Sequence, residues 1–137
     1  MEYLIGVIVA VVVAGAGRII GLDRGRSFYP TVLIGVAAYY VLFAAMGASE
    51  TVLGIEIAIG LGFSLLAVLG FKGSMWLVAI GIAGHGVFDL FHHLLIDNRG
   101  VPVWWPGFCA SVDLILGGWL AACLLKRPDR RGPAVAD

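Results

Sequence analysis

The sequence predicts an all-α integral membrane protein, a single domain of five transmembrane helices over residues 1–125. Of the 137 residues, 61% are hydrophobic and 13% are charged, whereas soluble domains are about 25% charged. Five apolar stretches each approach the ~20 residues that cross a bilayer. Short polar links separate them, so consecutive helices should run antiparallel. The polar residues 126–137 are predicted to form a cytoplasmic tail.

Residues that start or stop helices delimit each predicted span. The spans are residues 3–22, 30–46, 51–71, 75–96 and 107–125. Pro30 opens the second span, because proline is favourable in the first turn of a helix. Ser49 is a candidate N-cap for the third span, and the fourth begins directly after Ser74. The fifth span begins after Pro106.

The distribution of basic residues predicts the orientation of the bundle. Five spans put the two termini on opposite sides of the membrane. If the tail is cytoplasmic, one basic residue in the links, Arg99, lies outside, and Arg18 lies near the cytoplasmic end of its span. The others lie inside: Arg24, Arg26, Lys72, Lys126, Arg127, Arg130 and Arg131. This bias fits the positive-inside rule, and we expect the N-terminus outside and the C-terminus inside.

Ionisable side chains lie within the predicted spans, although each costs at least ~2.5–3.5 kcal/mol there. Counted at ~1.5 Å per residue from the outer helix ends, Glu56 and Asp113 lie ~8 Å deep. Asp89 lies ~10 Å deep and His92 ~6 Å. At ~100° per residue, His85 shares a face with Asp89 and His92 within ~60°. Three spans therefore place acids and imidazoles at one level near the outer face.

A divalent metal ion, zinc or iron, would satisfy such a cluster, since imidazole and carboxylate are common ligands of both. Asp89 and His92 have the i,i+3 spacing that chelates a metal in helical bundles. Asp89 has i,i+4 spacing with His85 and with His93. His85 and His92 lie ~10.5 Å apart along the axis, so both on one ion would be strained. We expect Asp89 and two of the three histidines as ligands. The candidate metal-binding residues are therefore His85, Asp89, His92 and His93.

A metal-dependent hydrolase is the first functional hypothesis. Metal-activated water would attack a lipid-like or small apolar substrate at the membrane. Asp113 or Glu56 would complete the site, and both are candidate catalytic acids or bases. The layout resembles the alkaline ceramidase and adiponectin-receptor group of membrane hydrolases, which also use acids and histidines from separate spans. That group has seven spans and a His-x3-His pair where this chain has His85-x3-Asp89, so the resemblance implies site layout only.

Other functions fit the same residues. A hydrogen-bonded His/Asp network without metal would suit a non-catalytic binding or assembly protein, or a proton or ion translocator. All three histidines lie on one span, which excludes a bis-histidine haem within one chain. The formal net charge of zero indicates no nucleic-acid partner. Small-residue pairs favour close helix packing, within the chain or in a homo-oligomer: Gly17-x3-Gly21, Ala58-x3-Gly62 and Gly60-x3-Ser64.

Two stretches resemble a family of small uncharacterised bacterial membrane proteins. They are HGVFDLFHH at residues 85–93 and GVPVWWPGFC at residues 100–109. The likeness extends over most of the chain. It implies a multi-pass protein of the bacterial inner membrane and assigns no activity. Trp104 and Trp105 are expected at the outer membrane interface, where amphipathic rings are favoured.

Overall fold

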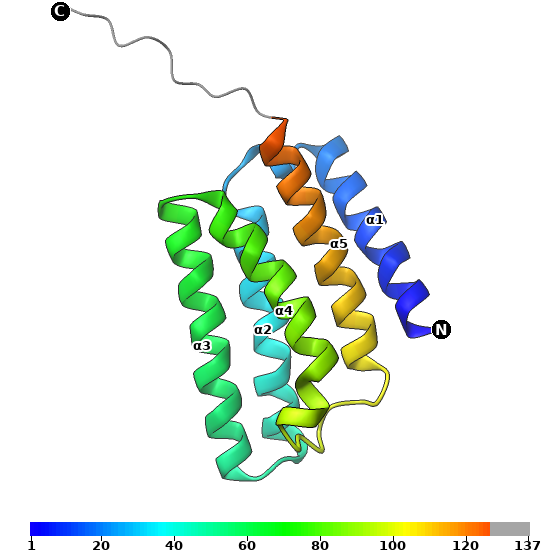
Figure 1. Cartoon of the computed structure of the whole chain (residues 1–137), viewed down its shortest axis with the longest axis vertical. Coiled ribbons are helices and arrows are strands. Elements are labelled where there is room, and N and C mark those ends of the chain that lie inside the picture. The colour runs from blue at the N-terminus through cyan, green and yellow to red at the C-terminus, as the bar shows by residue number, and fades with distance from the viewer. Residues whose placement is uncertain (127–137) are drawn as a thin grey trace, which may run out of the picture.

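The computed structural model describes residues 1–126 (Figure 1). The helices are α1 (Glu2–Ile20), the 3-10 helix η1 (Leu22–Arg24), α2 (Phe28–Gly47), α3 (Glu50–Lys72), α4 (Met75–Leu95) and α5 (Trp105–Leu125). Within this part of the chain there is no strand, and five helices are long and apolar enough to cross a membrane. The predicted all-α fold is confirmed, and the five helices are long and apolar enough to be the predicted spans. The predicted tail, beyond Lys126, lies outside the described residues.

Several helix ends follow from the residues that stand there. Ser49 accepts a hydrogen bond from the Val52 amide at 3.3 Å, and Ser74 accepts one from the Trp76 amide at 3.4 Å. Both serines are therefore N-caps, which replace water at an otherwise unpaired amide. Gly21 ends α1 with a φ of 85°, a left-handed conformation that glycine adopts without steric cost.

α4 lies at the centre of the bundle and packs against α5, α3 and α2. α2 also packs on α3, and α1 packs mainly against α5 rather than against α2, its neighbour in sequence. Consecutive helices alternate in direction, as predicted (Figure 1). The bundle therefore has a loop end, where α4 ends and α5 begins, and a basic end, where α5 ends.

At the basic end, Arg26 joins two links. Its guanidinium donates hydrogen bonds at 2.6–3.2 Å to three backbone carbonyls around the end of α3: Gly70, Phe71 and Gly73. These carbonyls belong to the last turn of a helix, where intrahelical partners are missing. The sequence assigned Arg26 only to the positive-inside bias. In the structure it also connects the α1–α2 link to the α3–α4 turn.

Glycines allow α4 and α5 to approach closely. A Cβ atom added to Gly117 of α5 would lie 2.8 Å from the Ala83 nitrogen and 3.1 Å from the Ala79 carbonyl oxygen. A Cβ on Gly86 of α4 would lie 3.0 Å from the Ala110 carbonyl oxygen. Backbone atoms cannot yield as a flexible side chain can, so these two glycines set the separation of the helices.

The small-residue pairs that the sequence offered serve different purposes. Gly60 packs inside the chain, where a Cβ would lie 3.3 Å from the Val41 side chain. A Cβ on Gly17 would lie 3.5 Å from the ring of Phe28, whereas a Cβ on Gly62 would meet nothing within 4 Å. Intrachain packing thus explains Gly17 and Gly60. The homo-oligomer that these faces also suggested stays a prediction.

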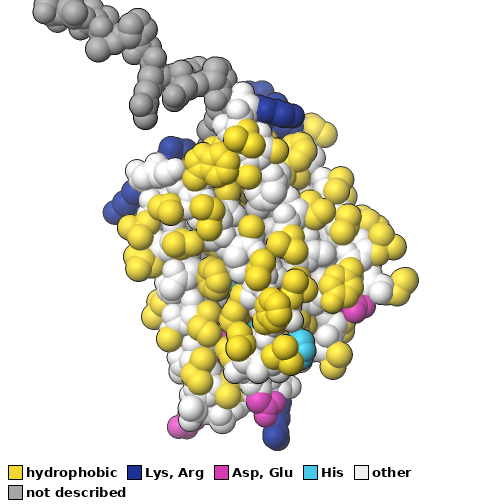
Figure 2. All heavy atoms as spheres, viewed as in Figure 1, with side chains coloured by type: hydrophobic (Ala, Val, Ile, Leu, Met, Phe, Trp, Pro, Cys, Tyr) yellow, Lys and Arg dark blue, Asp and Glu magenta, His cyan; other side chains and the backbone are white. Residues whose placement is uncertain are grey.

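The sides of the bundle are apolar and its exposed charges lie mainly at the ends. On the face in Figure 2, hydrophobic side chains cover the flanks, and most of the Lys and Arg side chains gather at the basic end. An apolar belt between charged ends suits a protein whose flanks contact lipid. The described helices therefore fit a multi-pass membrane protein.

Candidate metal centre

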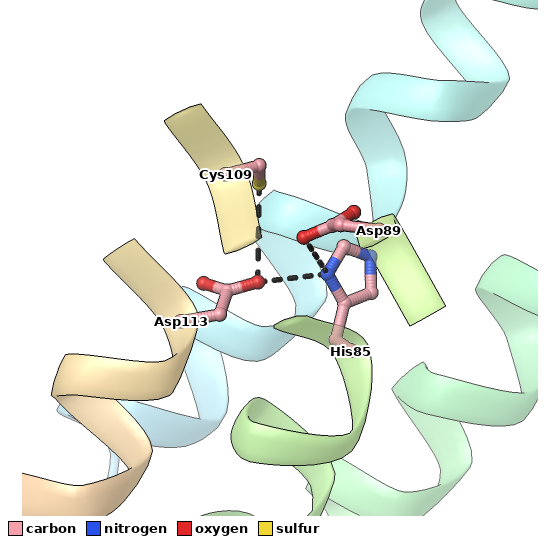
Figure 3. A group of neighbouring side chains, drawn as sticks. All are labelled: His85, Asp89, Cys109 and Asp113. Carbon is pink, nitrogen blue, oxygen red and sulfur yellow. Dashed lines mark hydrogen bonds and ion pairs between the residues drawn. The ribbon is translucent and has the colours of Figure 1, made fainter. Parts of the chain in front are cut away.

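Four potential metal ligands converge between α4 and α5, near the loop end (Figure 3). They are His85, Asp89, Cys109 and Asp113, and one ligand atom of each lies within 4.8 Å of the others. Each helix contributes a pair with i,i+4 spacing, which puts both side chains of a pair on one face. All four residues are at most 2% exposed. The bundle interior therefore holds a compact nitrogen, sulfur and oxygen donor set.

The distances are close to those of a metal site. His85 Nδ1 lies 2.8 Å from Asp113 Oδ2 and 3.5 Å from Asp89 Oδ2. The Cys109 thiol donates to the same Asp113 oxygen over 3.8 Å. With zinc bonds of ~2.0–2.3 Å, ligand atoms of a tetrahedral site lie roughly 3.3–3.8 Å apart. Small side-chain movements would let these atoms hold one ion.

The chemistry of the donors favours zinc or iron. A thiolate and an imidazole are soft or borderline ligands, which select transition metals. Magnesium and calcium prefer a shell made of oxygen atoms alone. Two carboxylates, one imidazole and one thiol therefore form a donor set that could hold a transition-metal ion.

Tyr40 of α2 holds one oxygen of Asp89. Its hydroxyl donates to Asp89 Oδ1 at 2.7 Å. Its ring stacks on the His92 imidazole, with centroids 4.0 Å apart and planes at 20°. Because Oδ1 is occupied by the phenol, the other oxygen of Asp89, Oδ2, faces His85.

Glu56 and His92 form a second buried pair next to Tyr40. His92 Nε2 lies 2.7 Å from Glu56 Oε1. Asn98, in the α4–α5 loop, donates to the same Glu56 oxygen at 2.8 Å and to the Tyr40 carbonyl at 3.2 Å. A carboxylate that accepts a hydrogen bond from an imidazole fixes the orientation of the ring. The loop, α2, α3 and α4 thus meet at this pair.

The donor set and the Glu56–His92 pair together bury three carboxyl groups and two imidazoles. Glu56, Asp89 and Asp113 each leave one carboxylate oxygen without a hydrogen bond within residues 1–126. Three carboxylates outweigh the imidazoles of His85 and His92 by one charge, even with both rings protonated. An unbalanced buried charge is costly, and a divalent cation beside these oxygens would offset it, with one imidazole neutral as its ligand. The unpartnered oxygens are an independent indication of a cation site.

A pocket of about 420 Å³ leads from the loop end to the site. Its wall combines the start of α1, the end of α4 and the loop, and includes Glu2, Tyr3, His93 and residues 101–103. It reaches Asp89 and His92, whereas the other three residues of the donor set do not line it. Asp89 is therefore the member of the donor set that borders the pocket.

Apolar side chains separate the site from the basic end. Leu33, Val78, Ile82 and Leu116 belong to this core, and none is more than 1% exposed. In the described part of the chain, the buried acid outside the two groups is Asp23, at the far end. The site is consequently reached from the loop end, and among residues 1–126 no chain of buried ionisable groups continues to the basic end.

The residues that the sequence selected fall into three places. His85 and Asp89 lie in the donor set, and Asp113 joins them as the predicted completing acid. Glu56 and His92 pair with each other, and His93 is exposed on the pocket wall. Cys109 was not predicted as a ligand, although its i,i+4 spacing from Asp113 is the signal that could have identified it. Asn98 gave no signal, because its partners are distant in sequence.

No family model, curated protein or solved structure matches the chain. A function is therefore inferred from the chemistry of the site.

Proposed function

We propose that this protein is a metal-dependent hydrolase of the membrane, acting on an uncharged, largely apolar ester or amide. The observation that carries the proposal is the donor set of His85, Asp89, Cys109 and Asp113, in which four buried ligand atoms lie within 4.8 Å. The adjoining pocket supports a substrate site at Asp89. Glu2, Asp89 and Asp97 line this pocket without any Lys or Arg, which disfavours an anionic substrate.

Three residues would hold the ion: His85, Cys109 and Asp113. Catalytic zinc sites typically use three protein ligands and keep one position open. Asp89 is the member of the donor set that faces the pocket, so the open position would lie beside it. When bound, such an ion supplies an activated water nucleophile and a Lewis acid. This assignment exchanges the roles that the sequence suggested for Asp89 and Asp113.

Asp89 would serve as the general base. Tyr40 occupies its Oδ1, whereas Oδ2 makes no hydrogen bond in the described chain and lies 3.5 Å from His85 Nδ1. With His85 on the ion, Oδ2 would accept a proton from water. The water oxygen then forms a bond to the substrate carbonyl carbon. A buried carboxylate next to a fixed phenol keeps one geometry, which a general base requires.

His92 would serve as the general acid. It lines the pocket and Glu56 orients its ring through the 2.7 Å contact. As the bond from the carbonyl carbon to the leaving oxygen or nitrogen breaks, the imidazole gives that atom a proton. The products are a carboxylic acid and an alcohol or amine. The proton held by Asp89 returns to His92 through the pocket water, so the site is regenerated.

A non-catalytic metal protein is the second candidate. Four donors can also close a coordination shell, and a closed shell is typical of structural sites. In that case Asp89 would be a ligand rather than a base. Ion translocation is less well supported, because the apolar core separates the site from the basic end.

The metal content of the purified protein tests the proposal. We expect about one zinc or iron ion per chain in wild type and an almost complete loss in His85→Ala, because a ligand disappears. His93→Ala is the matched control, since His93 lies on the same helix but is exposed. Elemental analysis after purification without added metal gives the stoichiometry. A metal-free wild type would refute the proposal, and equal metal in wild type and His85→Ala would refute the ligand assignment.

We further propose that the loop end faces the non-cytoplasmic side, in a bacterial inner membrane as the sequence resemblance suggests. The expected result is that an impermeant maleimide labels Arg99→Cys in intact cells and labels Lys72→Cys only after permeabilisation. Both variants would carry Cys123→Ser, since Cys123 is partly exposed whereas Cys109 is buried. The reverse labelling pattern would overturn this orientation.

A further inference from the structure

A second pocket, of about 250 Å³, lies at the basic end of the bundle. The ends of α1 and α5, the start of α2 and the link between α1 and α2 form it. Its wall carries charges of both signs and two aromatic rings: Arg18, Asp23, Tyr29, Trp119 and Lys126. The metal-site proposal uses none of these residues, and the apolar core separates the two pockets.

Two polar atoms in this pocket are buried without a partner. Asp23 is 9% exposed and Tyr29 is 2% exposed. Asp23 Oδ1 and the Tyr29 hydroxyl make no hydrogen bond within residues 1–126. The other oxygen of Asp23, Oδ2, accepts from Arg18 at 3.2 Å. A buried polar atom without a partner is costly, so both atoms indicate that a ligand belongs here.

The chemistry of the wall defines that ligand. Arg18 and Lys126 are exposed cations that can bind a phosphate, and the Tyr29 hydroxyl can donate to the same group. Asp23 Oδ1 is a free acceptor, and its best partner is an N–H donor with positive charge. One small ligand has to bring an anion and a protonated amine together.

We propose that this pocket binds the phosphoethanolamine headgroup of a membrane phospholipid. The phosphate would lie between Arg18, Lys126 and Tyr29, and the ammonium would donate to Asp23. A lipid is favoured over a soluble molecule because exposed apolar side chains adjoin the pocket. These are Ile19, Ile20, Trp119 and Leu125, from 38% to 87% exposed. Trp119 also suits the headgroup level, where indole rings are favoured.

The proposal predicts discrimination between lipids that share a phosphate. Phosphatidylcholine has the same charges but no N–H donor, so it would leave Asp23 Oδ1 unpaired. Phosphatidylglycerol offers the phosphate without an ammonium group. We expect wild type to retain phosphatidylethanolamine over phosphatidylcholine by about tenfold, which corresponds to one hydrogen bond to a charged group.

Native mass spectrometry of the full-length protein tests this prediction. The detergent-purified protein is incubated with equal amounts of the three lipids, all with the same acyl chains. Asp23→Asn should bring the ethanolamine-to-choline ratio close to one. Tyr29→Phe should lower the retention of all three lipids, because its hydroxyl would donate to phosphate. Tyr39→Phe is the matched control, since Tyr39 lies on the same helix but is 43% exposed outside this pocket.

Three results would overturn the proposal. Equal retention of the ethanolamine and choline lipids by wild type would remove the role of Asp23. An unchanged preference in Asp23→Asn would have the same consequence. If Asp23→Asn does not fold, the retention of lipid by Tyr29→Phe still tests the pocket. Equal thermal stabilisation of lipid-free protein by soluble phosphoethanolamine and by phosphatidylethanolamine at the same concentration would show that the acyl chains contribute nothing and that the ligand is the free headgroup compound. None of these results bears on the metal content, so the two proposals fail separately.

Discussion

Asp89→Asn is expected to retain the metal ion and to lose at least ~100-fold in hydrolysis rate, the usual contribution of a general base. Asp113→Asn is expected to lose the ion and the activity together. The difference follows from position. Asp89 faces the pocket and is held by Tyr40, whereas Asp113 lies 2.8 Å from His85 Nδ1 on the side away from the pocket. An amide in place of Asp89 keeps the shape and one oxygen that can accept from Tyr40, but it replaces the other oxygen by an NH2 group, which cannot accept the proton from water.

The measurement combines elemental analysis with release of para-nitrophenolate from para-nitrophenyl butyrate, an uncharged apolar ester, in detergent. Glu50→Gln serves as the control and should retain both properties, since Glu50 is an exposed acid outside the pocket. Loss of metal in Asp89→Asn would favour the closed, non-catalytic site. Full activity in Asp89→Asn would contradict its role as the base.

Gly117→Ala is expected to destabilise the protein by about 1–3 kcal/mol, the typical cost of overpacking a core, and to weaken metal binding. The added Cβ would lie 2.8 Å from the Ala83 nitrogen and 2.9 Å from the Ala83 Cβ. α5 can relieve this contact only by moving away from α4. His85 and Asp89 are on α4, and Cys109 and Asp113 are on α5, so the movement separates the two halves of the donor set.

Gly118→Ala provides the matched control for Gly117→Ala. It makes the same chemical change one residue along the same helix, where the new Cβ would meet nothing within 4 Å. Its helix propensity gain should leave stability unchanged or slightly higher. Thermal unfolding in detergent and the metal content of the folded fraction measure both effects. Equal unfolding temperatures for the two variants would show that the α4–α5 contact is not set by Gly117.

The sequence predicted the bundle well because each span carries its own signals. Apolar length identified the five helices, and Ser49 and Ser74 marked two of their starts. These signals are local, so they do not depend on which helices become neighbours. The packing of α1 against α5 depends on contacts between residues about a hundred positions apart, and no local signal encodes it.

Helix periodicity predicted which side chains share a face, but not which of them contact one another. Helix periodicity put His85 and Asp89 on one face, and both lie in the donor set. Periodicity cannot tell how far a helix is rotated toward each neighbour. That rotation turns His92 toward Glu56 of α3, and it brings Cys109 and Asp113 of α5 to His85. The sequence therefore indicated that these acids and histidines lie at a similar depth, but not that they form two separate groups.

Asn98 has a consequence for how the pocket can work. Its amide nitrogen ties the α4–α5 loop to the Tyr40 carbonyl and to Glu56. Two residues along, a Cβ on Gly100 would collide with the Phe43 backbone, so the loop is seated directly on α2. Swinging this loop aside would break the contacts that orient His92 and would disturb Tyr40, the partner of Asp89. The contacts hold the mouth of the pocket at one width, and under the proposed function this width would select substrates by size.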